Sequence, residues 1–112
     1  MTQPRVELLF WEGCPSHPQA LAQLREAMQE LGLHAEAIEV RHVDTDERAE
    51  AEGFVGSPTI RIDGVDVQEP GDEPTALTCR IYHRRDGRIS AVPDPADVRD
   101  ALHTAITTRS RT

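Results

Sequence analysis

The first half of the chain alternates short apolar runs with one amphipathic stretch. Residues 6–11 form an apolar run that lies between a proline and a glycine, which is typical of a buried strand. Between residues 21 and 31, leucine and methionine recur at spacings of three and four, which predicts a helix with one buried face that ends at Gly32. Charged and uncharged residues then alternate over 38–42, which predicts a second strand.

Helix caps and turns mark the elements that follow. Thr45 or Asp46 can begin a short helix that ends at Gly53. The alternating segment 59–63 predicts a third strand, which closes with an Asp-Gly turn pair. The next segment, 65–76, contains two prolines, a glycine and four acidic side chains, so we expect it to be an acidic surface loop.

The last third of the chain predicts one more strand and one more helix. Alternation over 77–82 predicts a fourth strand, with Leu77, Cys79 and Ile81 on one face. Asp94 suits the N-cap of a final helix, and Pro95 suits the first position of that helix. We expect the chain to fray from residue 107, with 109–112 as a loose tail.

These elements predict a single α/β domain over residues 1–112. Their order is β-α-β-α-β-β-α. The first crossover predicts a parallel pair of strands, and the last strand is expected to be antiparallel at the edge. The expected architecture is a mixed four-stranded sheet with helices on both faces.

Composition narrows the function classes. The 112 residues include 12 basic and 20 acidic side chains, which give a net charge of −8. An acidic surface repels phosphate backbones, so no nucleic-acid partner is expected. No apolar stretch is long enough to span a bilayer, and we expect neither a membrane partner nor a targeting segment. With only two cysteines, a disulfide scaffold is not expected. We expect a reducing, cytoplasmic setting.

Cys14 is the strongest candidate for chemistry. It follows the first strand, where the free N–H groups and the dipole of the predicted helix favour a thiolate. Pro15 suits the first position of that helix. His17 lies about one turn further on, where its ring could donate a hydrogen bond to the sulfur and lower the pKa of Cys14. The alternative is that Cys14 is an inert, half-buried residue.

The order of elements and two motifs resemble the thioredoxin-like superfamily. The motifs are Phe-Trp-Glu-Gly-Cys-Pro-Ser-His at 10–17 and Gly-Ser-Pro-Thr-Ile at 56–60. The chain is also similar to small bacterial proteins labelled thioredoxin family or alkylmercury lyase. The resemblance covers about 6–107. It implies a cis bond before Pro58, which would bring the backbone of Ser57 beside the sulfur to pair with an extended substrate chain. A trans proline at the start of a strand is the alternative.

The first motif departs from the dithiol pattern of that superfamily. His17 occupies the position of the second cysteine of Cys-x-x-Cys. A two-thiol cycle within the motif is therefore impossible, and the sequence favours monothiol chemistry at Cys14. The residues expected to contact the substrate are Trp11, Pro15, Ser57, Pro58 and Thr59. Trp11 either flanks Cys14 in a surface groove or packs in the core.

Cys79 has three interpretations. The first, which we favour from the alternation, is a buried core residue on the fourth strand. The second is a resolving cysteine for Cys14, although a place two strands away would leave the two residues roughly 10 Å apart. The third is metal binding. A complete Cys₂His₂ zinc site is not expected, because Cys79 and His83 would lie about 13 Å apart along a strand.

The leading functional hypothesis is a monothiol thioredoxin-like redox protein, a candidate thiol-disulfide oxidoreductase. Cys14 would attack a disulfide or oxidised thiol on a protein or a small molecule. No cofactor is expected, and glutathione or another thiol would serve as co-substrate. One alternative is a soft-metal or organomercurial thiol-binding protein that uses Cys14 and Cys79. Another is a binding module that keeps the fold without turnover.

Overall fold

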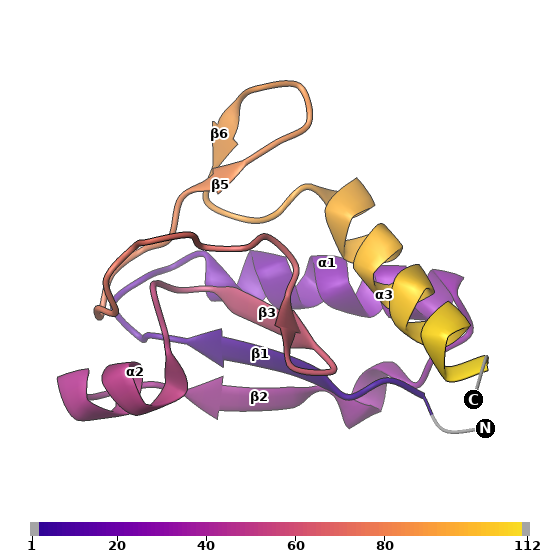
Figure 1. Cartoon of the computed structure of the whole chain (residues 1–112), viewed down its shortest axis with the longest axis horizontal. Coiled ribbons are helices and arrows are strands. Elements are labelled where there is room, and N and C mark those ends of the chain that lie inside the picture. Colours follow the sequence, from indigo (N-terminus) through magenta and orange to yellow (C-terminus); the bar gives the residue numbers. More distant parts are fainter. Residues whose placement is uncertain (1–2, 111–112) are drawn as a thin grey trace.

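Three helices and a four-stranded sheet make up the body of the molecule in a computed structural model that describes residues 3–110 (Figure 1). In chain order the elements are β1 (Val6–Phe10), α1 (His17–Glu30), the short 3-10 helix η1 (Ala35–Ala37), β2 (Glu39–His42), α2 (Asp46–Glu52), β3 (Thr59–Ile62), β4 (Val65–Asp66), β5 (Tyr82–His83), β6 (Ile89–Ser90) and α3 (Pro95–Ser110). The predicted α/β class with a mixed four-stranded sheet is confirmed.

The sheet is arranged around β1. Its strand order is β2-β1-β3-β4. β1 pairs with β2 in parallel, so the chain crosses over through α1, and it pairs with β3 in antiparallel. Leu8 lies opposite Val40 on one side and Ile60 on the other. Because β1 and β3 are antiparallel, the C-terminal end of β1 lies beside the start of β3.

The fourth strand is not the predicted segment 77–82. Asp63 and Gly64 take φ values of 52° and 81°, so the chain reverses within two residues and Val65 pairs with Ile62. β4 therefore falls inside the predicted loop 65–76. Residues 77–81 lie outside the sheet and make one isolated bridge, between Cys79 and Ser57. An extended segment carries the same alternating pattern whether or not it joins a sheet.

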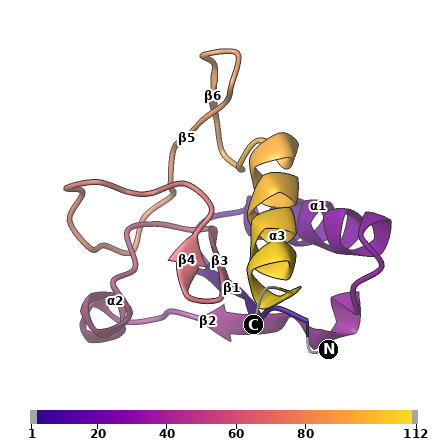
Figure 2. The ribbon, with the colours of Figure 1, turned by 45° about the vertical axis from the view of Figure 1, so that its right-hand side comes forward.

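Two apolar clusters cover the two faces of the sheet. Because neighbouring side chains of a strand point to opposite faces, Leu8 and Leu9 of β1 belong to different clusters. The larger cluster packs α1 and α3 on the Leu8 face. The smaller one contains Leu9, Val43, Ala49 of α2 and Phe54. Figure 2 shows α1 and α3 on one side of the sheet and α2 on the other, so the prediction of helices on both faces is confirmed.

Most of the predicted helix ends are confirmed. The Thr45 hydroxyl accepts a hydrogen bond from Arg48 N at 3.1 Å, and Gly53 ends α2 with a φ of 66°. Asp94 caps α3 by accepting from Ala96 N at 3.0 Å. The start of α1 differs from the prediction: it begins at His17 with Ser16 as its N-cap, so Pro15 precedes the helix.

Two predictions about the later part of the chain are wrong or untested. α3 continues through Ser110, so the predicted fraying from Thr107 does not occur at 107–110. Residues 111–112 of the predicted tail lie outside the described residues.

The hairpin β5–β6 projects from the body of the molecule in both views (Figures 1 and 2). None of the helices within residues 3–110 is long and apolar enough to cross a membrane.

A buried ion pair fixes the segment that follows β4. The guanidinium of Arg80 contacts both carboxylate oxygens of Asp66, at 2.8 and 3.0 Å, and its side chain is 3% exposed. It also donates to the Thr59 hydroxyl at 3.3 Å and to the Gln68 carbonyl oxygen, and it lies over the ring of Tyr82. A buried charge is tolerated only when it is paired and hydrogen-bonded. Arg80 therefore ties 76–82, called the strap below, to β3 and β4.

We predict that Asp66→Ala lowers the free energy of unfolding by about 3–5 kcal/mol, because it leaves the Arg80 charge buried without its partner. The measurement is urea denaturation followed by circular dichroism. Asp100→Ala is the matched control. Asp100 pairs with Arg85 at the surface, where the two side chains are 69% and 52% exposed, and exposed pairs contribute at most about 1 kcal/mol. Equal effects of the two substitutions would contradict the assignment.

Candidate functional site

The Cys14 sulfur is enclosed by polar groups. The backbone N–H of Cys14 donates to the Trp11 carbonyl oxygen at 3.1 Å, in the turn between β1 and α1. The residue is completely buried. Its thiol lies 3.4 Å from the Ser57 carbonyl oxygen and 3.7 Å from the Ser16 hydroxyl. Cys14 is therefore buried more deeply than the sequence suggested, but among hydrogen-bonding groups and not only apolar ones.

Ser57 is the neighbour that faces the sulfur from the start of β3. The Ser57–Pro58 peptide bond is cis, as the resemblance implied. Ser57 is fully buried, and its hydroxyl has no hydrogen-bond partner within the described residues. A buried hydroxyl without a partner is costly. A hydrogen bond from the Ser57 hydroxyl to the ionised sulfur lowers the pKa of Cys14. The Cys14 thiolate is therefore the acceptor that this hydroxyl would use.

Cys79 is exposed, so its interpretation as a buried core residue is wrong. The error follows from the assignment of 77–82 to the sheet. The strap instead lies beside the loop that precedes β3, and Cys79 is bridged to Ser57 in parallel. The estimated separation of about two strands from Cys14 does not apply outside the sheet.

The backbone of Ser57 is already paired within the chain. Its N–H donates to the Thr78 carbonyl at 2.8 Å, and its carbonyl oxygen accepts from Arg80 N at 2.8 Å. The predicted pairing of a substrate chain with this backbone would therefore require displacement of the strap, which occupies the edge. Thr59, another predicted contact, is buried, and its hydroxyl donates to the Gly56 carbonyl at 2.7 Å.

The two thiols influence each other's ionisation. Burial of the sulfur raises the pKa of Cys14, but the hydrogen bonds that its thiolate accepts outweigh burial, so this pKa lies below its ordinary value. The donors, in order of effect, are the Cys79 thiol, the backbone and hydroxyl of Ser16, and the Ser57 hydroxyl. The hydrogen bond to Cys14, together with burial and the thiolate charge, raises the pKa of Cys79. Cys14 is therefore the first of the two to ionise.

His17 does not occupy the predicted position beside the sulfur. Its ring stacks on Phe10 with centroids 4.2 Å apart, and its Nδ1 lies 3.3 Å from the Cys14 carbonyl oxygen. The groups that shift the pKa of Cys14 do not include His17. The expected hydrogen bond between ring and sulfur is replaced by contacts from Ser16 and Ser57, because the helix begins later than predicted and the ring packs on β1.

Trp11 and Pro15, also predicted to contact substrate, have different surroundings. Trp11 is half-buried and packs on the smaller apolar cluster together with Leu77. A Cβ on Gly13 would come within 2.4 Å of the Trp11 ring, so the glycine lets the indole fold over the loop. This favours the core interpretation of Trp11. Pro15 is exposed.

Three contributors to the site were not found from the sequence. Ser16 could have been found locally, because a serine two residues after a cysteine at a helix start can reach the sulfur. The Tyr82 hydroxyl donates to the Pro58 carbonyl oxygen at 2.5 Å. That contact and the Arg80–Asp66 pair join residues 14–24 positions apart, and no local pattern signals them.

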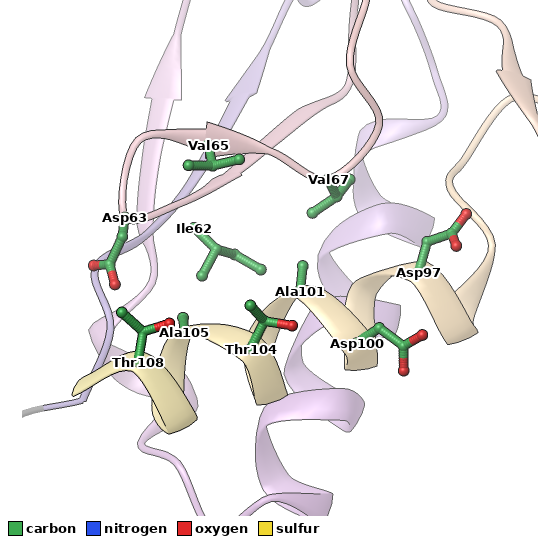
Figure 3. Close-up of a pocket in the computed structure, with 10 residues that line it drawn as sticks. All are labelled: Ile62, Asp63, Val65, Val67, Asp97, Asp100, Ala101, Thr104, Ala105 and Thr108. Carbon is green, nitrogen blue, oxygen red and sulfur yellow. The ribbon is translucent and has the colours of Figure 1, made fainter. Parts of the chain in front are cut away.

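Among the residues that the structure describes, no group of three or more histidine, cysteine or acidic side chains could hold a metal ion. A hollow of about 430 Å³ lies away from Cys14, between the β3–β4 hairpin and α3 (Figure 3). Ile62, Val65, Val67 and Ala101 form its apolar part, with Asp97 and Asp100 at one end. It contains no thiol or histidine.

Comparison with protein-family models, curated proteins and solved structures finds no match to this chain.

We predict that alkylation of Cys14 rises with pH at a midpoint below the value of about 8.5 for an ordinary cysteine. Only the thiolate reacts, so a lowered pKa moves the rise in rate to lower pH. The rate is followed by mass spectrometry of the Cys14 peptide after iodoacetamide treatment. Cys79→Ser keeps a hydroxyl donor and should preserve the low midpoint, whereas Cys79→Ala removes the donor and should raise it. A wild-type midpoint at or above that of free cysteine would contradict the pKa assignment.

Proposed function

We propose that this chain is a thioredoxin-like domain that carries out thiol–disulfide exchange through Cys14. The observation that carries the proposal is the contact of the buried Cys14 sulfur with Ser16 and Ser57, together with the bridge between Cys79 and that same Ser57. The cysteine at the β1–α1 junction and the cis bond before β3 support the thioredoxin-like assignment.

The chemistry begins with the ionised sulfur. The Cys14 thiolate attacks one sulfur of a disulfide RSSR, the S–S bond breaks, and RS⁻ leaves and takes a proton from solvent. The product is a mixed disulfide between Cys14 and R. The hydroxyls of Ser16 and Ser57 stabilise the thiolate before attack, because hydrogen bonds to the charged form favour it. A second thiol then resolves the mixed disulfide.

The surroundings of Cys14 favour a small substrate. The sulfur is buried, and Cys79, which is bridged to Ser57, is exposed to solvent. An extended protein chain would have to displace the strap from the Ser57 backbone, together with its two hydrogen bonds. A low-molecular-weight disulfide such as oxidised glutathione needs only a local movement near the sulfur.

The test mixes reduced protein with oxidised glutathione at neutral pH and measures the release of reduced glutathione over time. Wild type should release glutathione in a rapid phase that Cys14→Ser lacks. Ser57→Ala should slow this phase, because it removes a donor that lowers the pKa of Cys14. If Cys14→Ser reacts as fast as wild type, Cys14 is not the nucleophile, and the alternative of a binding module without turnover gains support.

A second candidate function, binding of a soft metal ion or an organomercurial, is favoured by the pairing of the two thiols. Thiolates select soft ions such as Hg(II) and Cu(I). Cys79 is bridged to Ser57, whose carbonyl oxygen contacts the Cys14 sulfur, and two sulfur ligands suit a two-coordinate soft ion.

This candidate predicts that Cys14→Ser and Cys79→Ser each weaken Hg(II) binding, measured by competition with dithiothreitol. His83→Ala is the control and should bind like wild type, because its side chain is not part of the thiol pair. If Cys79→Ser bound Hg(II) as tightly as wild type, a two-thiol metal site would be ruled out.

A further inference from the structure

The strap is held along the segment that precedes β3. At one end, Ala76 N donates to the Phe54 carbonyl oxygen at 3.1 Å. At the other, the Tyr82 hydroxyl donates to the Pro58 carbonyl oxygen. The strap and 54–58 therefore run side by side.

The register of the strap brings Cys79 beside Ser57, the residue that contacts the Cys14 sulfur. Thr78 and Arg80 hold the two backbone groups of Ser57, so Cys79 is the residue bridged to it. The carbonyl oxygen of that same serine lies 3.4 Å from the Cys14 sulfur. One buried residue thus lies beside both cysteines, although they are 65 positions apart in the sequence.

Side-chain packing prevents this register from slipping. A shift by one residue would move the buried Arg80 guanidinium away from Asp66 and leave both charges unpaired. Gly56 adds a steric constraint, because a Cβ there would lie 2.9 Å from the Arg80 Cβ and 3.0 Å from its backbone. The close approach of the strap therefore depends on that glycine, and the position of Cys79 is a built feature of the fold.

The two cysteines also have complementary properties. Cys14 is buried and ionises first, whereas Cys79 is exposed and keeps its proton longer. Their interaction pairs a nucleophile with a protonated thiol that solvent can reach.

We propose that Cys79 is the resolving thiol of Cys14 and that the oxidised form of the protein contains a Cys14–Cys79 disulfide. This inference rests on the proposed function. After Cys14 forms a mixed disulfide with R, the Cys79 sulfur loses its proton and attacks the Cys14 sulfur. The bond between Cys14 and R breaks, and RS⁻ leaves with that proton. Overall, one small disulfide is reduced to two thiols, and the two protein thiols are oxidised to one disulfide.

Such a cycle uses two thiols of one chain, and its second thiol lies outside the Cys-x-x-x motif. The strap presents Cys79 where an extended substrate chain would otherwise pair with Ser57. The resolving group is therefore part of the same chain, and no second glutathione is needed to complete the oxidation of the protein.

The test treats the reduced full chain with oxidised glutathione, blocks free thiols with N-ethylmaleimide, and measures intact mass and peptide masses without reduction. Wild type should end as a bridge between the Cys14 and Cys79 peptides, with two glutathione thiols released per chain. Cys79→Ser should stop at a stable glutathione adduct on Cys14, with one thiol released. Its circular dichroism spectrum should match that of wild type.

The outcomes separate this inference from the proposed function. A wild-type adduct on Cys14 as long-lived as that of Cys79→Ser would overturn the resolving role, while thiol–disulfide exchange through Cys14 would stand. Absence of both adduct and bridge in wild type would overturn the proposed function, and the inference with it. A bridge in wild type together with a stable adduct in Cys79→Ser would support both.

Discussion

Both backbone hydrogen-bonding groups of Ser57 are taken by one short segment, through Thr78 and Arg80. The geometry of the thiol site depends on this pairing. It brings Cys79 beside a serine whose carbonyl oxygen contacts the Cys14 sulfur and whose buried hydroxyl has no hydrogen-bond partner among the residues that the structure describes. Without the pairing, the chain would have one buried thiol in the turn after β1 and one separate thiol on a surface loop.

The pairing is maintained by interactions outside the thiol site. The Arg80–Asp66 pair joins the strap to β4, and β4 exists because the Asp63-Gly64 turn reverses the chain directly after β3. The two-residue strand looks minor, yet it supplies the carboxylate that permits a guanidinium to be buried beside the site. Leu77 and Trp11 pack on the smaller apolar cluster and anchor the start of the strap to the opposite face from α1 and α3.

Local signals in the sequence were sufficient for the helices and the inner strands. The caps at Thr45 and Asp94, the turn glycines and the periodicity of α1 depend on neighbours within a few residues, and those predictions are confirmed. The cis bond at Pro58 followed from a motif. The location of the fourth strand, the exposure of Cys79 and the environment of His17 could not be predicted in the same way. Each depends on contacts between distant segments, and the alternation over 77–82 does not distinguish a sheet strand from an extended segment with a single bridge.

The proposed thiol chemistry of this acidic α/β domain depends on the seating of the strap on Ser57. Amide hydrogen exchange followed by nuclear magnetic resonance tests that seating most directly, because it reports on each hydrogen bond separately. The account predicts that the amides of Ser57 and Arg80 exchange slowly, at rates close to those of β1 and β3. Exchange of the Arg80 amide as fast as that of an open surface loop would contradict it.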